Sequence, residues 1–63
     1  MYEVIAWYSE NSQRVIASGL RDLDCAINYA NTEFNRNRGA IVSVTTPNGF
    51  IKCEVSEFGV LHH

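Results

Sequence analysis

The sequence predicts an α+β domain of two layers, in which a four-stranded, mostly antiparallel sheet carries one helix on one face in the order β-β-α-β-β. Two observations predict this class. The middle of the chain places apolar residues at helical spacing, and the segments on either side are rich in β-branched and aromatic residues separated by turn formers. A helix and a sheet that each have one apolar side are expected to pack on each other.

The first two strands are expected to form a hairpin. Tyr2 to Tyr8 is dominated by β-branched and aromatic residues and is too short for a stable helix. The polar cluster Ser9 to Ser12 is typical of a turn, and Gln13 to Ser18 then returns to apolar residues, with Gly19 ending the second strand.

The helix is the clearest element. Its apolar stripe has spacings of three and four residues and consists of Leu20, Leu23, Ile27, Ala30 and Phe34. Asp22 is suited to the N-cap and Asp24 to the first turn, because anions stabilise a helix N-terminus. Arg36 and Arg38 fall in the last turn, and Gly39 is suited to terminate the helix.

A second hairpin is expected after the helix. Ala40 to Thr46 has strong β propensity, and Thr46 to Gly49 contains proline and glycine at positions that suit a tight turn. In the final strand, Phe50 to Phe58, the apolar residues Ile51, Cys53 and Val55 alternate with polar ones. Alternation of this kind predicts that one side of the strand faces the core.

Length and composition predict a single domain over residues 1–63 that needs no cofactor and is located in the cytoplasm. The chain has 63 residues, 46% of them hydrophobic, and a net charge of −2, which gives no general field for nucleic acid or an anionic membrane. There is no apolar run long enough to cross a membrane, and the N-terminal residues do not resemble a signal peptide.

The cysteines and histidines predict no catalytic or metal site. Cys25 and Cys53 are expected to be buried small hydrophobic residues rather than a disulfide, and neither Cys-x-x-Cys nor His-x-x-x-His spacing occurs. His62 and His63 are the last two residues; a frayed end positions a catalytic base badly, and they are also what a purification tag would leave. The protein is therefore expected not to be an enzyme.

The sheet is expected to be apolar on both faces. In the first strand, one alternating set contains Val4 and Tyr8 and the other contains Ile5 and Trp7, so large apolar side chains remain outside the core whichever set is buried. Exposed aromatic residues are enriched in interfaces. We therefore expect a protein-interaction module that forms a homodimer or binds another protein, with these candidate contact residues: Trp7, Tyr8, Phe50 and Phe58. The alternative is that Trp7 closes the edge of the core and the tyrosines are ordinary half-buried strand residues.

A nucleic-acid-binding module is the alternative function. Its candidate phosphate contacts are Arg14, Arg36, Arg38 and Lys52, with Trp7 or Phe50 available to stack an unpaired base. Five basic residues against seven acidic ones is a low count for this function, since each phosphate contact needs its own cation.

The layout from Ser12 to Pro47, with the helix Asp22-Leu23-Asp24-Cys25-Ala26-Ile27-Asn28-Tyr29-Ala30 between two strands, is similar to that of a small bacteriophage inhibitor of host RNA polymerase. It also resembles small bacterial ββαββ domains in which an Ala-Ile-x-x-Ala helix precedes a strand and a Pro-x-Gly hairpin. The shared positions are those of helix core and turns, so no functional residue is carried over and no family is assigned. The resemblance implies a small, phage-encoded protein that acts by binding another protein.

Overall fold

The fold is an α+β arrangement of two layers, a sheet and a helix. The computed structural model describes residues 1–37 and 39–63, and within these ranges the chain forms one helix and a five-stranded antiparallel sheet. The elements are β1 (Tyr2–Ser9), β2 (Ser12–Leu20), α1 (Leu23–Arg36), β3 (Ile41–Thr45), β4 (Ile51–Ser56) and β5 (Gly59–His62). The predicted class is confirmed, whereas the predicted number of strands, four, is wrong by one.

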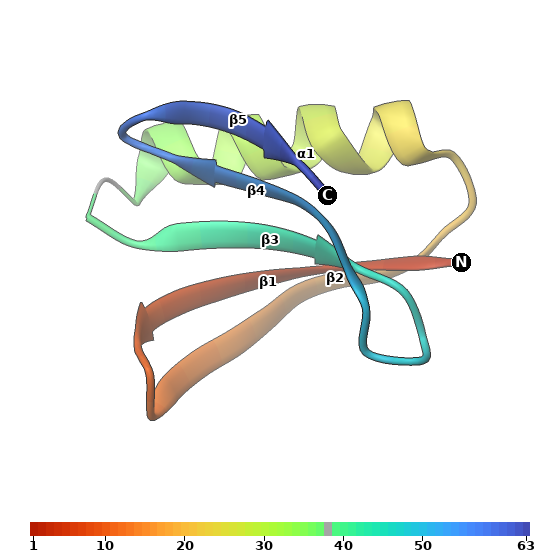
Figure 1. Ribbon diagram of the computed structural model, residues 1–63, viewed down its shortest axis with the longest axis horizontal. Helices are drawn as coiled ribbons and strands as arrows, with labels where there is room; N and C mark the ends of the chain where they lie inside the picture. Colours follow the sequence, from red (N-terminus) through yellow and green to blue (C-terminus); the bar gives the residue numbers. More distant parts are fainter. Residues whose placement is uncertain (38) are drawn as a thin grey trace.

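The strand order is β2-β1-β3-β4-β5, and every neighbouring pair is antiparallel. Since β2 and β3 both run antiparallel to β1, they run parallel to each other, and α1 is the crossover that joins them. Figure 1 shows α1 behind the sheet, so that one sheet face is turned towards the helix and the other away from it.

The helix begins as the capping signals predict. Asp22 is the N-cap, and its Oδ1 accepts a hydrogen bond of 3.1 Å from the backbone N–H of Asp24. The helix ends at Arg36, followed by the C-cap Asn37, while the predicted terminal residue Arg38 lies outside the described ranges. The apolar stripe starts one turn later than expected, because Leu20 is the last residue of β2.

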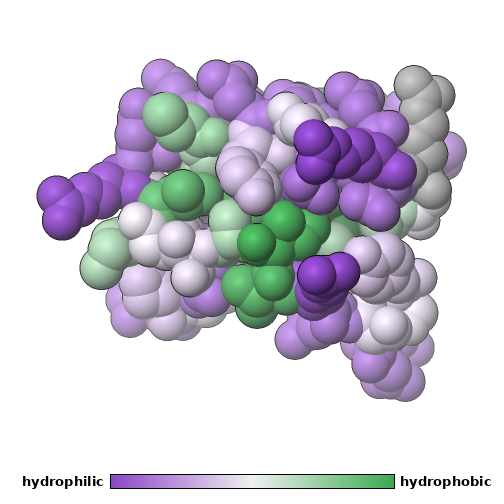
Figure 2. Space-filling model, turned by 180° about the vertical axis from the view of Figure 1, so that it is seen from behind, coloured by the Kyte–Doolittle hydropathy of each residue, from purple (hydrophilic) through white to green (hydrophobic). Residues whose placement is uncertain are grey.

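Small residues let the helix approach the sheet closely. Ala6 in β1 and Ala26 and Ala30 in α1 have no exposed surface. The buried cluster consists of Val4, Ala6, Ala26, Ala30, Val42, Val44, Cys53 and Val55. The helix packs mainly over β3 and β1, less over β4, and least over β2. Figure 2, seen from the helix side, shows hydrophobic residues gathered in the middle of this face.

The two cysteines have different environments, contrary to the expectation that both are buried. Cys53 lies in the core, but Cys25 is exposed. A helix turns by about 100° per residue, so Cys25 lies roughly 160° around the helix from Leu23 and from Ile27, which both pack against the core. Both thiols are free.

The fifth strand corrects the prediction of one long strand from Phe50 to Phe58. β4 ends at Ser56, Glu57 and Phe58 form a turn, and Gly59 has a φ of 107°, a left-handed conformation that favours glycine. The chain then folds back along β4.

The C-terminal histidines are held in place, which corrects the expectation of a frayed end. His62 lies opposite Cys53 in the sheet. His63 donates its backbone N–H to the carbonyl of Lys52 at 3.0 Å, and its Nε2 lies 3.0 Å from Oε1 of Glu54.

Ile51, the first residue of β4, lies on the face of the sheet opposite to the one that the alternation predicts. The pairing of β3 with β4 is irregular, so that Val44 faces Cys53 and the next residue, Thr45, faces Ile51. Lys52 is the extra residue of a β-bulge, which reverses the alternation beyond it. Ile51 is therefore 38% exposed, away from the core that Cys53 and Val55 join.

Candidate functional site

The sheet face turned away from α1 is the candidate site, and we call it the open face. In β1, Val4 and Ala6 point towards the helix, so the alternating residues Ile5 and Trp7 point to the other side. The pairing register places further residues beside them. The open face carries Glu3, Ile5, Trp7, Gln13, Val15, Ile41, Ser43, Thr45, Ile51, Glu54 and Leu61.

The centre of the open face is held by a side-chain hydrogen bond between neighbouring strands. Nε1 of Trp7 donates to Oγ of Ser43 at 2.8 Å. Ser43 is only 1% exposed although no helix covers this side, because it lies between Ile5 and Glu54 in the register and beneath the indole. The bond satisfies the polar atom of the indole and keeps its ring against the sheet.

The apolar residues around this centre remain in contact with solvent. Val15 is 51%, Ile41 is 43% and Leu61 is 59% exposed, and they belong to β2, β3 and β5. They lie on three strands of the open face, and β4 with its polar residue Glu54 lies between Ile41 and Leu61.

A shallow groove of about 430 Å³ crosses the open face. Its lining includes Trp7, Tyr8, Ile41, Ile51 and Glu54, so the first two predicted contact residues share one groove. The carboxylate of Glu54 lies 3.0 Å from the imidazole of His63, so this acidic side chain of the groove contacts the C-terminal segment.

Phe58 and Phe50, the other two predicted contact residues, lie at opposite ends of β4. Phe58 is 92% exposed and lines a second groove of about 570 Å³ at one end of the sheet, where Ile41 and Glu54 again contribute. Phe50 is exposed beside the turn at the other end. The structure thus brings Trp7 and Tyr8 together, places Phe58 in an adjoining groove and leaves Phe50 apart.

Sequence reasoning missed four aliphatic residues of the open face, one of which is Val15, opposite Ile5 in β2. Ile41 and Ser43 alternate along β3 with the core residues Val42 and Val44. The strand pattern therefore predicts that Ile41 lies on the open face. The face on which Ile51 lies could not be predicted because of the bulge, and that of Leu61 could not be predicted because the fifth strand was not recognised.

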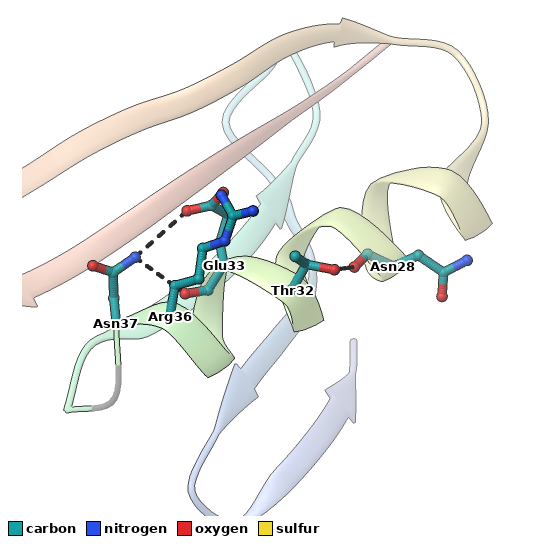
Figure 3. A network of polar contacts seen from close by, with 5 residues as sticks. All are labelled: Asn28, Thr32, Glu33, Arg36 and Asn37. Carbon is teal, nitrogen blue, oxygen red and sulfur yellow. Dashed lines mark hydrogen bonds and ion pairs between the residues drawn. The ribbon is translucent and has the colours of Figure 1, made fainter.

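The residues proposed for nucleic-acid contact are spread out. Arg14 lies in β2 and Lys52 in β4, with β1 and β3 between them, so these positions are roughly 14 Å apart at the usual strand spacing. Arg36 lies at the end of α1, 3.5 Å from Oε1 of Glu33, whose other polar contact is Asn37 (Figure 3). Arg38 lies outside the described residues.

Both thiols lie away from the open face. The pKa of Cys25 is raised by a hydrogen bond from its thiol to Asp22 and by the charge of that carboxylate, and burial raises the pKa of Cys53. In the described ranges, no group of histidine, cysteine and acidic residues is arranged to hold a metal ion.

Comparison of the chain with protein-family models, curated proteins and solved structures finds no match. A separate search of the described residues for a helix of sufficient length and hydrophobicity to span a membrane finds none.

Proposed function

We propose that the protein is a non-enzymatic interaction module that binds a protein partner through its open face. The observation that carries this proposal is the apolar surface formed by Trp7, Val15, Ile41 and Leu61 on the side of the sheet that the helix leaves uncovered. Antiparallel sheets commonly bury one face and present a polar one to water, and this sheet departs from that pattern.

Burial of the open face by a partner would contribute favourable free energy to association. Complete burial of a Val, Leu or Ile side chain is worth about 1.5–3 kcal/mol, so each half-exposed residue gains roughly 1 kcal/mol when a partner covers it. Trp7 contributes a large ring whose polar atom is already bonded within the protein, so burying it leaves no unsatisfied donor.

The contact is centred on Trp7 and Ile41, with Tyr8 at the edge of their shared groove. Phe58 extends the surface through the adjoining groove, whereas Phe50, the remaining candidate contact residue, lies apart at the far end of β4. The module is proposed to act in the cytoplasm, where free thiols such as Cys25 remain reduced.

The test compares proteins retained by three immobilised forms of the chain from an extract of the cells that encode it. Ile41→Lys places a charge on the open face, and Tyr29→Lys places the same charge on the helix, where Tyr29 is similarly exposed. Circular dichroism establishes that both variants are folded.

We expect one protein to be retained by the wild type and by Tyr29→Lys and to be lost with Ile41→Lys. Retention that survives Ile41→Lys, or that both substitutions weaken equally, overturns the assignment of the open face. If no protein is retained, a second readout is the protection of Trp7 fluorescence from acrylamide as the chain concentration rises. A Trp7 that stays fully quenchable in the extract and at all concentrations contradicts the proposal.

A further inference from the structure

The outer edge of β5 is exposed and has no pairing partner within residues 1–37 and 39–63. All four residues of β5 are exposed, and among the described residues β4 is the only element close to it. Figure 1 shows β5 at the border of the sheet, beside β4. A strand edge of this kind presents backbone donors and acceptors for pairing with another strand.

The direction of the free backbone groups follows from one hydrogen bond. His63 donates its N–H to the carbonyl of Lys52, so His63 points its backbone groups towards β4. Successive residues of a strand point these groups to alternate sides, so Leu61 also points inward. Val60 and His62 therefore direct both their N–H and their C=O groups away from the sheet.

The opposite border of the sheet is built differently. Pairing of β2 with β1 is interrupted by three register shifts, and β2 contains the charged residue Arg14. Bulges and charged residues are what proteins use to prevent pairing at an edge. β5 has neither; its pairing with β4 is regular and its sequence, Gly59–His62, contains no charged residue or proline.

We propose that β5 pairs antiparallel with β5 of a second copy of this chain, with Leu61 on the two-fold axis. In this register Val60 of one copy lies opposite His62 of the other, and the reverse. Each residue then donates to and accepts from its opposite, so every outward backbone group of the two residues is satisfied.

The side chains fit the same register. Val60 and His62 lie opposite Val55 and Cys53 and so are both on the helix side, which is the condition for facing each other in a continuous sheet. Leu61 lies on the open face and meets its own copy at a position without backbone hydrogen bonds, where side chains are closest. A two-fold axis through Val60 would instead place His62 opposite Phe58, which lies in a turn and not in a strand.

The proposed partner at the β5 edge is thus a second copy of the chain. The contact is self-complementary, as a two-fold interface requires, and joins two apolar open faces into one surface. The paired edge is short and smaller than the roughly 1,600 Å² of a standard interface, so we expect a dimer that dissociates on dilution.

The first experiment is analytical ultracentrifugation of three chains over a range of concentrations. Val60→Pro removes an outward N–H but no hydrogen bond to β4, and proline is tolerated at such edge positions. Val60→Ala removes the same side chain and keeps the N–H. We expect the wild type and Val60→Ala to dimerise, and Val60→Pro to require at least tenfold higher concentration.

The second experiment locates the axis by disulfide formation in a Cys25→Ser background, which removes the exposed native thiol. Leu61→Cys is expected to give a covalent dimer on mild oxidation, because facing residues at this type of position satisfy disulfide geometry. Val60→Cys is the control and is expected to cross-link at least tenfold more slowly, since it faces His62 of the other copy.

A wild type that is monomeric at every concentration overturns the proposal, and so does a Val60→Pro dimer of unchanged affinity. Faster cross-linking of Val60→Cys than of Leu61→Cys contradicts the register. Circular dichroism of Val60→Pro shows whether the chain is folded, and if it is not, the two cysteine variants decide. The inference is independent of the proposed function: Ile41→Lys tests the open face, whereas the proline variant tests the edge alone.

Discussion

Trp7 reaches across the sheet to Ser43 rather than to the residue directly opposite it. Trp7 faces Ile41 in the register, yet its Nε1 donates to Oγ of Ser43 at 2.8 Å, one position further along the same face of β3. The indole therefore lies along the sheet and covers the buried hydroxyl. This single bond explains how a polar residue at the centre of an uncovered face is sealed from water.

Removing either partner of this bond should destabilise the fold. Ser43→Ala leaves the indole N–H without its acceptor, and Trp7→Phe leaves a buried hydroxyl without its donor, so we expect each to lower the free energy of unfolding by about 1–3 kcal/mol. Urea unfolding followed by circular dichroism measures both. The double variant should cost less than the sum of the two, by about 1 kcal/mol, and strict additivity would contradict the coupling.

Replacing the helix cap should weaken α1. Asp22→Ala removes the acceptor for the N–H of Asp24, and we expect it to lower the free energy of unfolding by about 1 kcal/mol. Asp22→Asn retains a capping oxygen and is expected to cost only a few tenths of that. Thermal unfolding of the two variants makes the comparison, and equal losses would show that charge rather than the hydrogen bond is responsible.

The same aspartate should control the reactivity of Cys25. Because the Asp22 carboxylate raises the pKa of the Cys25 thiol, less of the reactive thiolate is present at any pH below that value. Asp22→Asn removes the charge and lowers this pKa, so alkylation of Cys25 by iodoacetamide should become faster at neutral pH and its pH profile should shift to lower pH. Mass spectrometry follows the reaction, with buried Cys53 as the internal control that stays unmodified in the folded chain. An unchanged profile would refute the influence of Asp22.

Gly59 should be the most sensitive position of the last hairpin. Its φ of 107° is costly for any residue with a Cβ, whereas space is not limiting, since a Cβ there meets nothing within 4 Å. We expect Gly59→Ala to cost about 1–2 kcal/mol and to speed amide exchange of Leu61 and His63, which bond to β4. Glu57→Ala, in the same turn without a positive φ, should leave exchange unchanged; equal effects of the two would argue against backbone strain.

The parts of the fold that local pattern determines were predictable. The cap at Asp22 and the helical spacing from Leu23 to Phe34 predict α1 with nearly its observed bounds. The turn at Glu57–Phe58 was missed because neither residue is a usual turn former, and the glycine that marks it comes one position later. Gly59 was the available signal, because some hairpin turns end in a glycine with a left-handed conformation.

The candidate site was predictable where strand alternation is regular and not where it breaks. Trp7 lies in a stretch of β1 whose alternation predicts its face directly. Ile51 directly precedes the bulge at Lys52, and this one inserted residue puts Ile51 on the face opposite to that of Cys53. Whether a bulge forms depends on the pairing with β3, which is a property of the folded sheet and not of the residues around Lys52.

The central position of β1 has a consequence for how the chain is made. β1 is joined to β2 by a short turn. The other edge of β1 pairs with β3, which is synthesised only after the whole of α1. The hairpin can close within microseconds, whereas the second pairing must also close the long intervening loop. A nascent chain therefore carries an open edge beside Ile5 and Trp7 until residue 45 is available. Mispairing during translation is most probable in that interval, and the arrival of β3 ends it.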